Sequence, residues 1–419
     1  MLYSWSFKKE FAFYGFYCLI LFIILELIVI KDLNNLPNCN SKGRKIVLIV
    51  SKIHRVKKAF QFKQDIIINC PNIGKNCEFV NLDKGHECFK EANFVLFNAV
   101  FSELFPAIPY LARTKLPNQK YAIGLWEAPS HTHIGTIFPY HLNDLVQQFD
   151  FTMYFDRENA DIWSREQNYD HFIPNKQRPR FNMTLVDEII NGKTRHMAAM
   201  ISDCFDDWGR LEFLNDLRQY GVSVDIYGWC GEMGPCLTYG DDNCYSNLEK
   251  DYFFYASLEN SICNGYVTEK IVRPLQHFLV PVAVGGIDYS NFTPPNSIVE
   301  VSKFENTKQL ADFLIALTKN LNDEYKKYFQ WKNDNWGISK FAASCEICQF
   351  LNGDRQFPTN MEQKKSLKNT KCWRGIYRQE KHQIDSYQDS GKRQIIRQLS
   401  GVWNDFQKQG FRIILRLFY

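Results

Sequence analysis

The stretch "YFFYASLENSICNGYVTEK" at 252–270 places a run of apolar residues directly before a dense group of polar ones. Its first part, 252–257, is typical of a strand buried on both faces of a parallel sheet. Thr268 before "EKIV" predicts the capped start of a helix. A strand followed by a helix needs only apolar residues at suitable spacing. The dense polar residues between the two therefore predict a ligand site.

Similar apolar runs recur along the chain in two series, and segments with helical spacing lie between them. Helical spacing is clear in "RLEFLNDLRQYG" at 210–221, which ends on a glycine, and in "NTKQLADFLIALTKN" at 306–320. This alternation predicts an α/β protein of two units with a cleft between them, joined within 175–195. The predicted strands lie at 45–50, 94–101, 121–126, 151–155, 196–201, 222–228, 252–257 and 279–286.

Length and composition agree with a two-domain globular protein. The chain has 419 residues, which is more than one ordinary core accommodates. Charged residues make up 23% and aromatic residues 15% of the chain, and both values are typical of folded proteins. The net charge of +4 is spread along the sequence, so nothing indicates a nucleic-acid partner.

Residues 11–30 form an apolar and aromatic run that only Gly15 and Glu26 interrupt, which is long enough to span a bilayer. A cleaved signal peptide is the alternative, but its apolar region usually has about 7–15 residues, and no A-x-A-like site follows this run. The sequence therefore predicts a retained transmembrane signal-anchor, with a cytoplasmic tail at 1–10 and a short stem at 31–44.

Cysteine usage predicts that the body lies in an oxidising lumen, because all but one of the 13 cysteines follow the predicted anchor. Cys345 and Cys348 are candidates for a structural disulfide, although their spacing is also that of half a zinc site, and no pairing can be assigned. Two N-glycosylation sequons, at Asn182 and Asn291, agree with a luminal body.

The polar group at 255–273 has the residue types that a sugar nucleotide requires. Tyr266 can stack on a base or donate its hydroxyl, and Lys270 is a compact cation for a phosphate oxygen. A helix that opens at Thr268 would direct free N–H groups to the same place. Hydrogen bonds to sugar hydroxyls are expected from Glu259, Asn260 and Glu269, and Arg273 lies one helical turn beyond Lys270. The alternative is an ordinary capped helix with surface charges.

The segments "FFYASLENSICNGYVTEKIVRPL" at 253–275 and "VPVAVGGIDYSNFTPPNSIVEVSKF" at 280–304 strongly resemble the donor-binding signature of the alpha-1,3-fucosyltransferases. The resemblance extends from about 94 to 350. It implies a GT-B-like fold of two Rossmann-like domains with an interdomain cleft. The implied divisions are an acceptor-side domain at 45–190 and a GDP-fucose-binding domain at 191–352. Composition indicates a basic extension at 353–419.

Three residues depart from the family signature: Leu258 stands for the usual Phe, and Val272 and Pro274 stand for Trp and Asn. Proline inside a helix removes a hydrogen bond and can kink the axis. The position of Arg273 is therefore left open.

The segment "LWEAPSHTH" at 125–133 resembles the acceptor-side motif of the same family. The resemblance implies that Glu127 is the general base and that His131 orients the substrate or the Glu127 loop. His131 and His133, two residues apart, could instead share a metal ion.

The resemblance further implies a diphosphate contact by Arg210 and a donor-side role for Tyr227 and Gly228 in "VDIYGWCG" at 224–231. Asp206 and Asp207 do not have the spacing of a D-x-D metal motif. We expect no obligatory metal, because Lys270 and Arg210 can carry the phosphate charge themselves, although a divalent cation such as Mn2+ could stimulate the reaction.

The expected function is transfer of L-fucose, with inversion, from GDP-β-L-fucose to a hydroxyl, the 3-hydroxyl of N-acetylglucosamine, on a glycoprotein or glycolipid glycan. The expected location is the Golgi membrane, as a single-pass type II protein with a luminal body. Three alternatives are an inverting transferase for another sugar nucleotide, an inactive glycan-binding relative, and a membrane receptor or structural protein.

Overall fold

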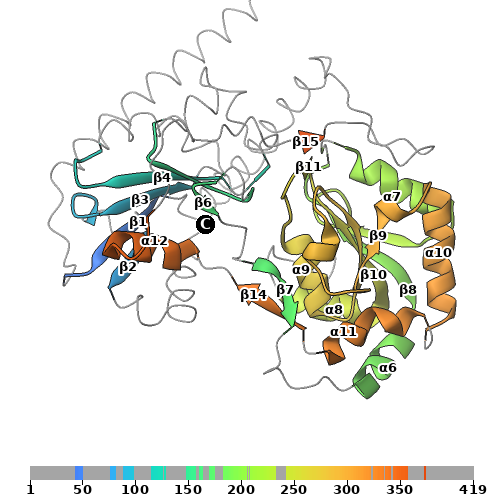
Figure 1. Cartoon of the computed structure of the whole chain (residues 1–419). Helices are drawn as coiled ribbons and strands as arrows, with labels where there is room; N and C mark the ends of the chain where they lie inside the picture. Colours follow the sequence, from blue (N-terminus) through green and yellow to red (C-terminus); the bar gives the residue numbers. More distant parts are fainter. Residues whose placement is uncertain are drawn as a thin grey trace, which may run out of the picture. The chain divides into compact units, whose positions relative to one another are not determined.

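The computed structural model divides into two compact units, and a sheet of parallel strands forms the centre of each (Figure 1). The first unit comprises Met1–Leu125, Tyr140–Tyr154 and Ala342–Lys364, and the second comprises Trp126–Pro139, Phe155–Phe341 and Lys365–Tyr419. The structure describes residues 43–50, 76–81, 88–98, 115–125, 127–128, 148–156, 160–163, 169–174, 183–204, 206, 208–232, 242–321, 324–334, 336–340, 343–356 and 372–373.

The first sheet has the strand order β2–β1–β3–β4–β5–β6. The pairs from β2 to β5 are all parallel. Its strands are β1 (Lys45–Val50), β2 (Cys77–Asn81), β3 (Phe94–Asn98), β4 (Lys120–Leu125), β5 (Phe151–Tyr154) and β6 (Ile162–Trp163). Side chains 46–50 of β1 and 121–125 of β4 are all buried, which explains their unbroken apolar runs.

Helix α12 (Ala343–Asn352) belongs to the first unit, although it comes late in the chain. A disulfide joins Cys348 of this helix to Cys77 in β2, and Phe350 meets the ring of Phe151 edge-on at 5.3 Å. Through these contacts the chain returns to the first sheet after residue 341. The units therefore differ from the predicted domains, which ended at 190 and 352.

The second sheet has the strand order β13–β12–β10–β8–β9, and all of its pairs are parallel. Its strands are β8 (Arg195–Met200), β9 (Val224–Tyr227), β10 (Tyr252–Leu258), β12 (Val280–Val284) and β13 (Val299–Glu300). All seven side chains of β10 are buried, as expected for a central strand with helices on both faces.

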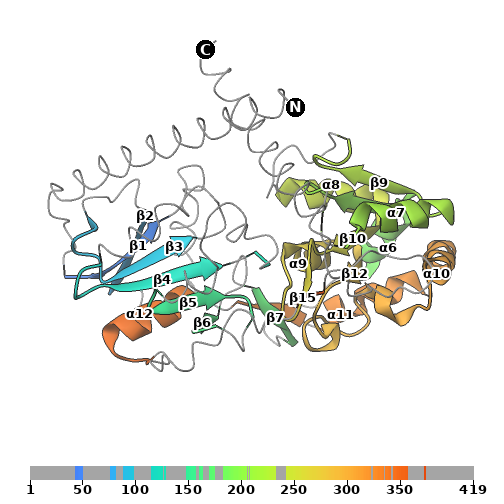
Figure 2. The same cartoon turned by 90° about the horizontal axis from the view of Figure 1, so that it is seen from above.

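Helices cover both faces of the second sheet (Figures 1 and 2). Alternate residues of β10 show this: Phe254 belongs to the core that includes Leu214 and Leu310, whereas Tyr255 belongs to the core that includes Tyr245. The helices of this unit are α6 (Met183–Asn191), α7 (Arg210–Gln219), α8 (Asp242–Asp251), α9 (Glu269–Gln276), α10 (Thr307–Lys319) and α11 (Gln330–Asn333).

Shorter elements complete the second unit. Strand β7 (Tyr169–Pro174) pairs antiparallel with β14 (Trp336–Lys340), and β11 (Ile262–Cys263) pairs antiparallel with β15 (Cys372–Trp373). The second pair also carries the disulfide Cys263–Cys372. The short 3₁₀ helices of this unit are η5 (Tyr289–Asn291), η6 (Val301–Lys303) and η7 (Tyr325–Phe329).

The α/β prediction is confirmed, and each predicted strand run overlaps an observed strand. The predicted tail and anchor at 1–30 and most of the extension at 353–419 lie outside the described residues. Among the helices that the structure describes, none combines the length and the apolar character needed to cross a membrane.

Candidate functional site

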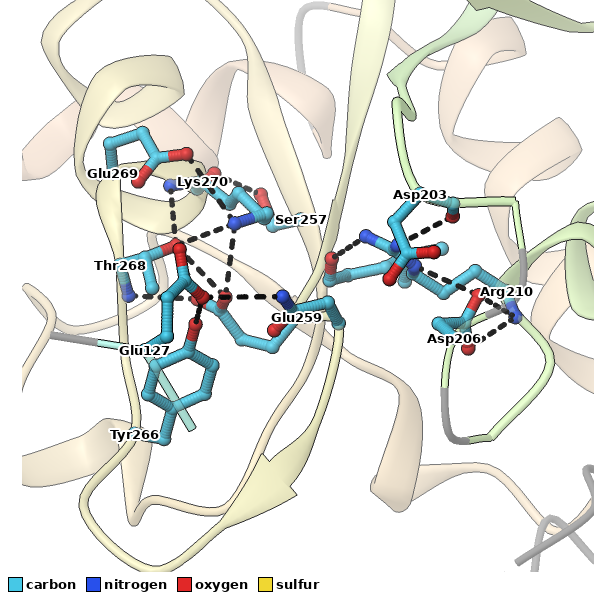
Figure 3. Close-up of polar contacts among 12 residues, drawn as sticks. Glu127, Asp203, Asp206, Arg210, Ser257, Glu259, Tyr266, Thr268, Glu269 and Lys270 are labelled. Carbon is cyan, nitrogen blue, oxygen red and sulfur yellow. Dashed lines mark hydrogen bonds and ion pairs between the residues drawn. The ribbon is translucent and has the colours of Figure 1, made fainter. Parts of the chain in front are cut away.

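The polar residues singled out in the second half of the chain gather at one end of the second sheet (Figure 3). Asp203 follows β8, Glu259 follows β10, and α9 begins at Glu269. Because the strands are parallel, their carboxyl ends meet at one edge, which is where open α/β sheets bind ligands.

Thr268 caps α9, and Glu259 supports the cap. The Thr268 hydroxyl accepts a hydrogen bond from Lys270 N. Thr268 in turn donates its backbone N–H to Glu259 Oε1 and its hydroxyl to Glu259 Oε2, both at 2.8 Å. Glu259 is 2% exposed. Its carboxylate is thus bound within the protein, whereas the sequence predicted contacts to sugar hydroxyls.

The ammonium group of Lys270 lies at the N-terminus of α9. Its Nζ is 2.9 Å from Thr268 Oγ1, 3.3 Å from Glu259 Oε2 and 3.4 Å from Glu269 Oε1. The Lys270 side chain keeps 18% of its surface exposed, whereas those of Glu259 and Glu269 keep 3% and 7%. A helix N-terminus and a partly exposed cation together form a site that favours anions.

Burial and the Lys270 charge act in opposite directions on the two carboxyl groups. Burial raises the pKa of Glu259 above its ordinary value, and attraction by Lys270 limits the rise. Burial would also raise the pKa of Glu269, but Lys270, the Glu269 backbone N–H and Arg273 together lower it. The ammonium group of Lys270 is therefore the charge that both buried acids depend on.

Glu127 lies two residues after β4, and the segment that contains it, Trp126–Pro139, belongs to the second unit. Tyr266 donates its hydroxyl to Glu127 Oε2 at 2.9 Å, and Asn260 Nδ2 is 3.4 Å from the same oxygen. Glu127 is partly exposed, and its carboxylate points to the hydroxyl of Tyr266 (Figure 3).

Arg210, predicted to contact diphosphate, is 2% exposed at the start of α7. Its guanidinium donates to Asp206 Oδ2 at 3.1 Å, to Asp203 O at 2.9 Å and to Leu258 O at 3.5 Å. Three of the five N–H groups of the guanidinium thus join the loop after β8 to the end of β10. The diphosphate contact remains a prediction.

Sequence reasoning considered Asp206 only as part of a metal motif and missed its structural role. Its Oδ1 accepts hydrogen bonds from the backbone N–H groups of Trp208, Gly209 and Arg210. An aspartate four residues before an arginine at a helix start was the available signal, because acidic side chains favour helix N-termini. Asp206 thus holds the loop that leads into α7, which begins at Arg210.

Tyr227 and Gly228 lie at the end of β9. The Tyr227 hydroxyl is 2.6 Å from that of Tyr252, which donates to Asp225 Oδ2 at 2.7 Å. Gly228 has a φ of +99°, and a Cβ there would lie 2.7 Å from Ile201 O. This glycine is thus required by the packing of the loop itself, and a contact to the donor by either residue remains a prediction.

Arg273 lies on α9 with its guanidinium carbon 5.7 Å from the ring centroid of Tyr245 in α8. Pro274 lies within α9 and cannot donate to the carbonyl oxygen of Lys270 four residues earlier. Ser257 in β10 donates its hydroxyl to that oxygen at 2.7 Å. The helix continues to Gln276, and Arg273 stays beside Tyr245 and close enough to Glu269 to affect its pKa.

Other predicted residues lie elsewhere or outside the described chain. Asn291 is exposed in η5, and its Nδ2 donates to Asp288 Oδ2 at 2.7 Å. Cys348 is bonded to Cys77, and Cys345 is also in a disulfide. His131 and Asn182 lie outside the described residues. Within the part that is described, no group of three or more His, Cys, Asp or Glu side chains could hold a metal ion.

Residues 190–371 match the family model described as the C-terminal part of glycosyltransferase family 10 (fucosyltransferase). The alpha-(1,3)-fucosyltransferase C of Drosophila melanogaster is 30% identical over 295 residues, which cover 68% of this chain and 66% of that protein. The alpha-(1,3)-fucosyltransferase fut-1 of Caenorhabditis elegans is 29% identical over 273 residues, which cover 65% and 56%. The chain thus spans a little over half to about two thirds of the length of these relatives.

Among solved structures, the chain is similar to a crystal structure of an alpha1,3-fucosyltransferase, with a TM-score of 0.45 and 16% sequence identity. The superposition covers 78% of this chain and 96% of that one. A structure described as an alpha1,3-fucosyltransferase with GDP-fucose gives a TM-score of 0.43 and 14% identity, over 74% and 90% of the two chains.

Proposed function

The chain belongs to glycosyltransferase family 10, the fucosyltransferases, and on this basis we propose that it transfers L-fucose from GDP-β-L-fucose to a glycan hydroxyl with inversion. The acceptor that we propose is the 3-hydroxyl of N-acetylglucosamine on a glycoprotein or glycolipid. The family membership supports the donor, and the geometry around α9 supports the roles of individual residues.

One observation carries the mechanistic proposal: two consecutive residues connect the candidate base to the candidate phosphate-binding cation. The Glu259 carboxylate is 3.3 Å from Lys270 Nζ, and the Asn260 amide nitrogen is 3.4 Å from Glu127 Oε2. A carboxylate that can take a proton and an ammonium that can hold an anion are thus linked through two neighbouring residues, and an inverting transfer uses one group of each kind.

In the proposed reaction, Glu127 takes the proton of the acceptor hydroxyl while the acceptor oxygen attacks the anomeric carbon of fucose. The bond between that carbon and the β-phosphate oxygen breaks, and its electron pair leaves with GDP. Lys270 and the first N–H groups of α9 stabilise the added charge on the diphosphate. Removal of one preorganised contact of this kind costs about 2.7–4 kcal/mol of barrier.

The proposal includes a GT-B arrangement and a location in the Golgi membrane, as a single-pass type II protein with a luminal body. The described disulfides Cys77–Cys348, Cys204–Cys230 and Cys263–Cys372 support an oxidising compartment. The exposed Asn291 is proposed as a glycosylation site. We propose that the step requires no metal, and that a divalent cation such as Mn2+ would only stimulate it by neutralising the departing diphosphate.

The test is incubation of the purified full chain with GDP-fucose, GDP-mannose and UDP-sugars in turn, on a glycan array, with product linkage determined. The proposal predicts transfer from GDP-fucose alone and an α1,3 linkage to N-acetylglucosamine. Transfer from a different sugar nucleotide would replace the proposed donor. Glycan binding without consumption of any donor would identify an inactive relative.

A further inference from the structure

The loop at 259–268, between β10 and α9, carries most of the polar residues of the candidate site, and a late part of the chain is bonded to it. Strand β11 lies within this loop and pairs antiparallel with β15, so that Cys263 lies opposite Cys372 (Figure 1). A disulfide joins these two cysteines, which are 109 residues apart. The predicted basic extension is therefore linked covalently to the candidate donor site.

Cys263 is fully buried, and its backbone packs against the loop after β12. A Cβ on Gly286 would lie 2.1 Å from Cys263 O, so the two backbones approach closely. On either side of Cys263, Glu259 donates its N–H to Val284 O at 3.3 Å, and Gly265 donates its N–H to Gly286 O at 3.2 Å. A shift of Cys263 would therefore disturb the packing of the 259–268 loop on its neighbour.

The position of Cys263 also affects the N-terminus of α9. Cys263 lies between Glu259 and Thr268 in the chain, and the Glu259 carboxylate accepts hydrogen bonds of 2.8 Å from the N–H and from the hydroxyl of Thr268. The same carboxylate is 3.3 Å from Lys270 Nζ. The two ends of the loop thus meet beside the candidate phosphate-binding cation, and the middle of the loop is bonded to Cys372.

The disulfide is the strong part of this connection. Strands β11 and β15 contribute two residues each, and a two-stranded pair is at best marginally stable by itself in water. A covalent bond between residues that are far apart in sequence restricts the chain without a long ladder of hydrogen bonds. Both strands belong to the second unit, so the bond acts within that unit.

We propose that Cys372 is a positioning residue for the donor: through its disulfide to Cys263, it keeps the 259–268 loop in the form that binds the diphosphate of GDP-fucose. This inference rests on the proposed function, which places the diphosphate at the N-terminus of α9. Residue 372 comes directly after the range 190–371 that matches the family model, so the match does not assign this role. The extension thereby takes part in donor binding.

The proposed role affects binding more than chemistry. A loop that is already ordered costs no ordering free energy when its ligand arrives. If loss of the bond leaves the loop in its binding form for about one tenth of the time, the apparent Kd rises about tenfold. Bound GDP-fucose would order the loop again, so the rate at saturation should change little.

The test measures the Kd for GDP by calorimetry, and the KM for GDP-fucose and kcat by fucose transfer, in the full chain and in Cys372→Ser. This variant breaks the bond at its partly exposed end and leaves the buried Cys263 in place. We expect Kd and KM to rise about tenfold and kcat to stay within about twofold. The control is Cys77→Ser, which breaks the disulfide to Cys348 in the first unit. It should lower the unfolding temperature and keep the Kd for GDP within about twofold.

Hydrogen exchange of the backbone N–H groups at 259–268 gives a readout that does not require activity. Without GDP these groups should exchange faster in Cys372→Ser than in wild type, and saturating GDP should slow them to the wild-type rate. The pair Cys263→Val/Cys372→Val leaves no free thiol at this place and replaces both sulfurs by apolar groups. It should behave as Cys372→Ser does, and it carries the test if Cys372→Ser yields no folded protein.

A Kd for GDP that is unchanged in both of these variants would overturn the proposal. An equal rise in Cys77→Ser would overturn it as well, because the cause would then be a general loss of stability. A fall in kcat with an unchanged Kd would assign the disulfide to another step, against the proposal. If wild-type protein binds no GDP and transfers no fucose, the proposed function itself fails. Failure of this inference alone leaves wild type active, so the two failures are distinguishable.

Discussion

The hydroxyl of Ser257 donates a hydrogen bond of 2.7 Å to the carbonyl oxygen of Lys270. In an unbroken helix this oxygen would accept the N–H of residue 274, which is a proline here. A side chain of the central strand β10 thus replaces the missing helical bond and fastens α9 to the sheet. Lys270, the cation at the start of α9, therefore lies in a helical turn that this bond completes.

The Ser257→Ala variant should lose about 1–3 kcal/mol of unfolding free energy, because the carbonyl oxygen of Lys270 would lose the donor that the buried Ser257 provides. In the Pro274→Ala background the same substitution should cost less, because the new N–H can bond to Lys270 O. Urea denaturation of wild type, Ser257→Ala, Pro274→Ala and the double variant measures the cost of Ser257→Ala in both backgrounds. An equal loss in both backgrounds would show that Ser257 does not compensate for the proline.

The Lys270→Met variant should lose stability and at least tenfold in GDP affinity. Stability should fall because Glu259 and Glu269 would remain buried without their nearest cation. Affinity should fall because the diphosphate loses its charge-assisted contact. Adding Glu259→Gln should recover part of the stability but none of the affinity. Calorimetry with GDP and thermal melting separate the two effects, and recovery of binding in the double variant would contradict the role of Lys270.

The contribution of Glu249 to the free energy of unfolding should depend on pH. Burial would raise its pKa, but hydrogen bonds from His277 and from the Phe278 backbone N–H lower it below the ordinary 4.5. A lowered pKa gives stability that is present above the unfolded value and is lost as the pH falls through the folded one. Glu249→Gln should therefore be less stable than wild type at pH 7, and the difference should shrink below about pH 4. A pH-independent difference in urea denaturation would contradict this assignment.

Local patterns were sufficient to predict most of the fold. The run 252–257 became β10, and the cap at Thr268 starts α9, because burial on both faces and satisfaction of helix N–H groups are requirements that nearby residues meet. The segment 210–221 likewise became α7 and ends before Gly221, whose φ is +91°. These features depend on neighbours in sequence and can be read from it.

Features that depend on distant residues could not be predicted. The bond between Cys77 and Cys348 spans 271 residues, so no local spacing signals the pairing or the return of α12 to the first unit. The burial of Glu259 and the contact between Glu127 and Tyr266, 139 residues apart, are likewise products of the assembled fold. The sequence predicted that Glu259 and Tyr266 contact the ligand, whereas in the structure both make hydrogen bonds to other residues of the protein.

Comparison of wild type with Glu127→Gln, in the full chain supplied with GDP-fucose and a glycan acceptor, tests the central claim most directly. The account predicts that the variant binds GDP as wild type does, and that its transfer rate falls by about 10²–10⁴-fold, because the amide cannot take the acceptor proton. Fucose transfer at the wild-type rate by Glu127→Gln would contradict it.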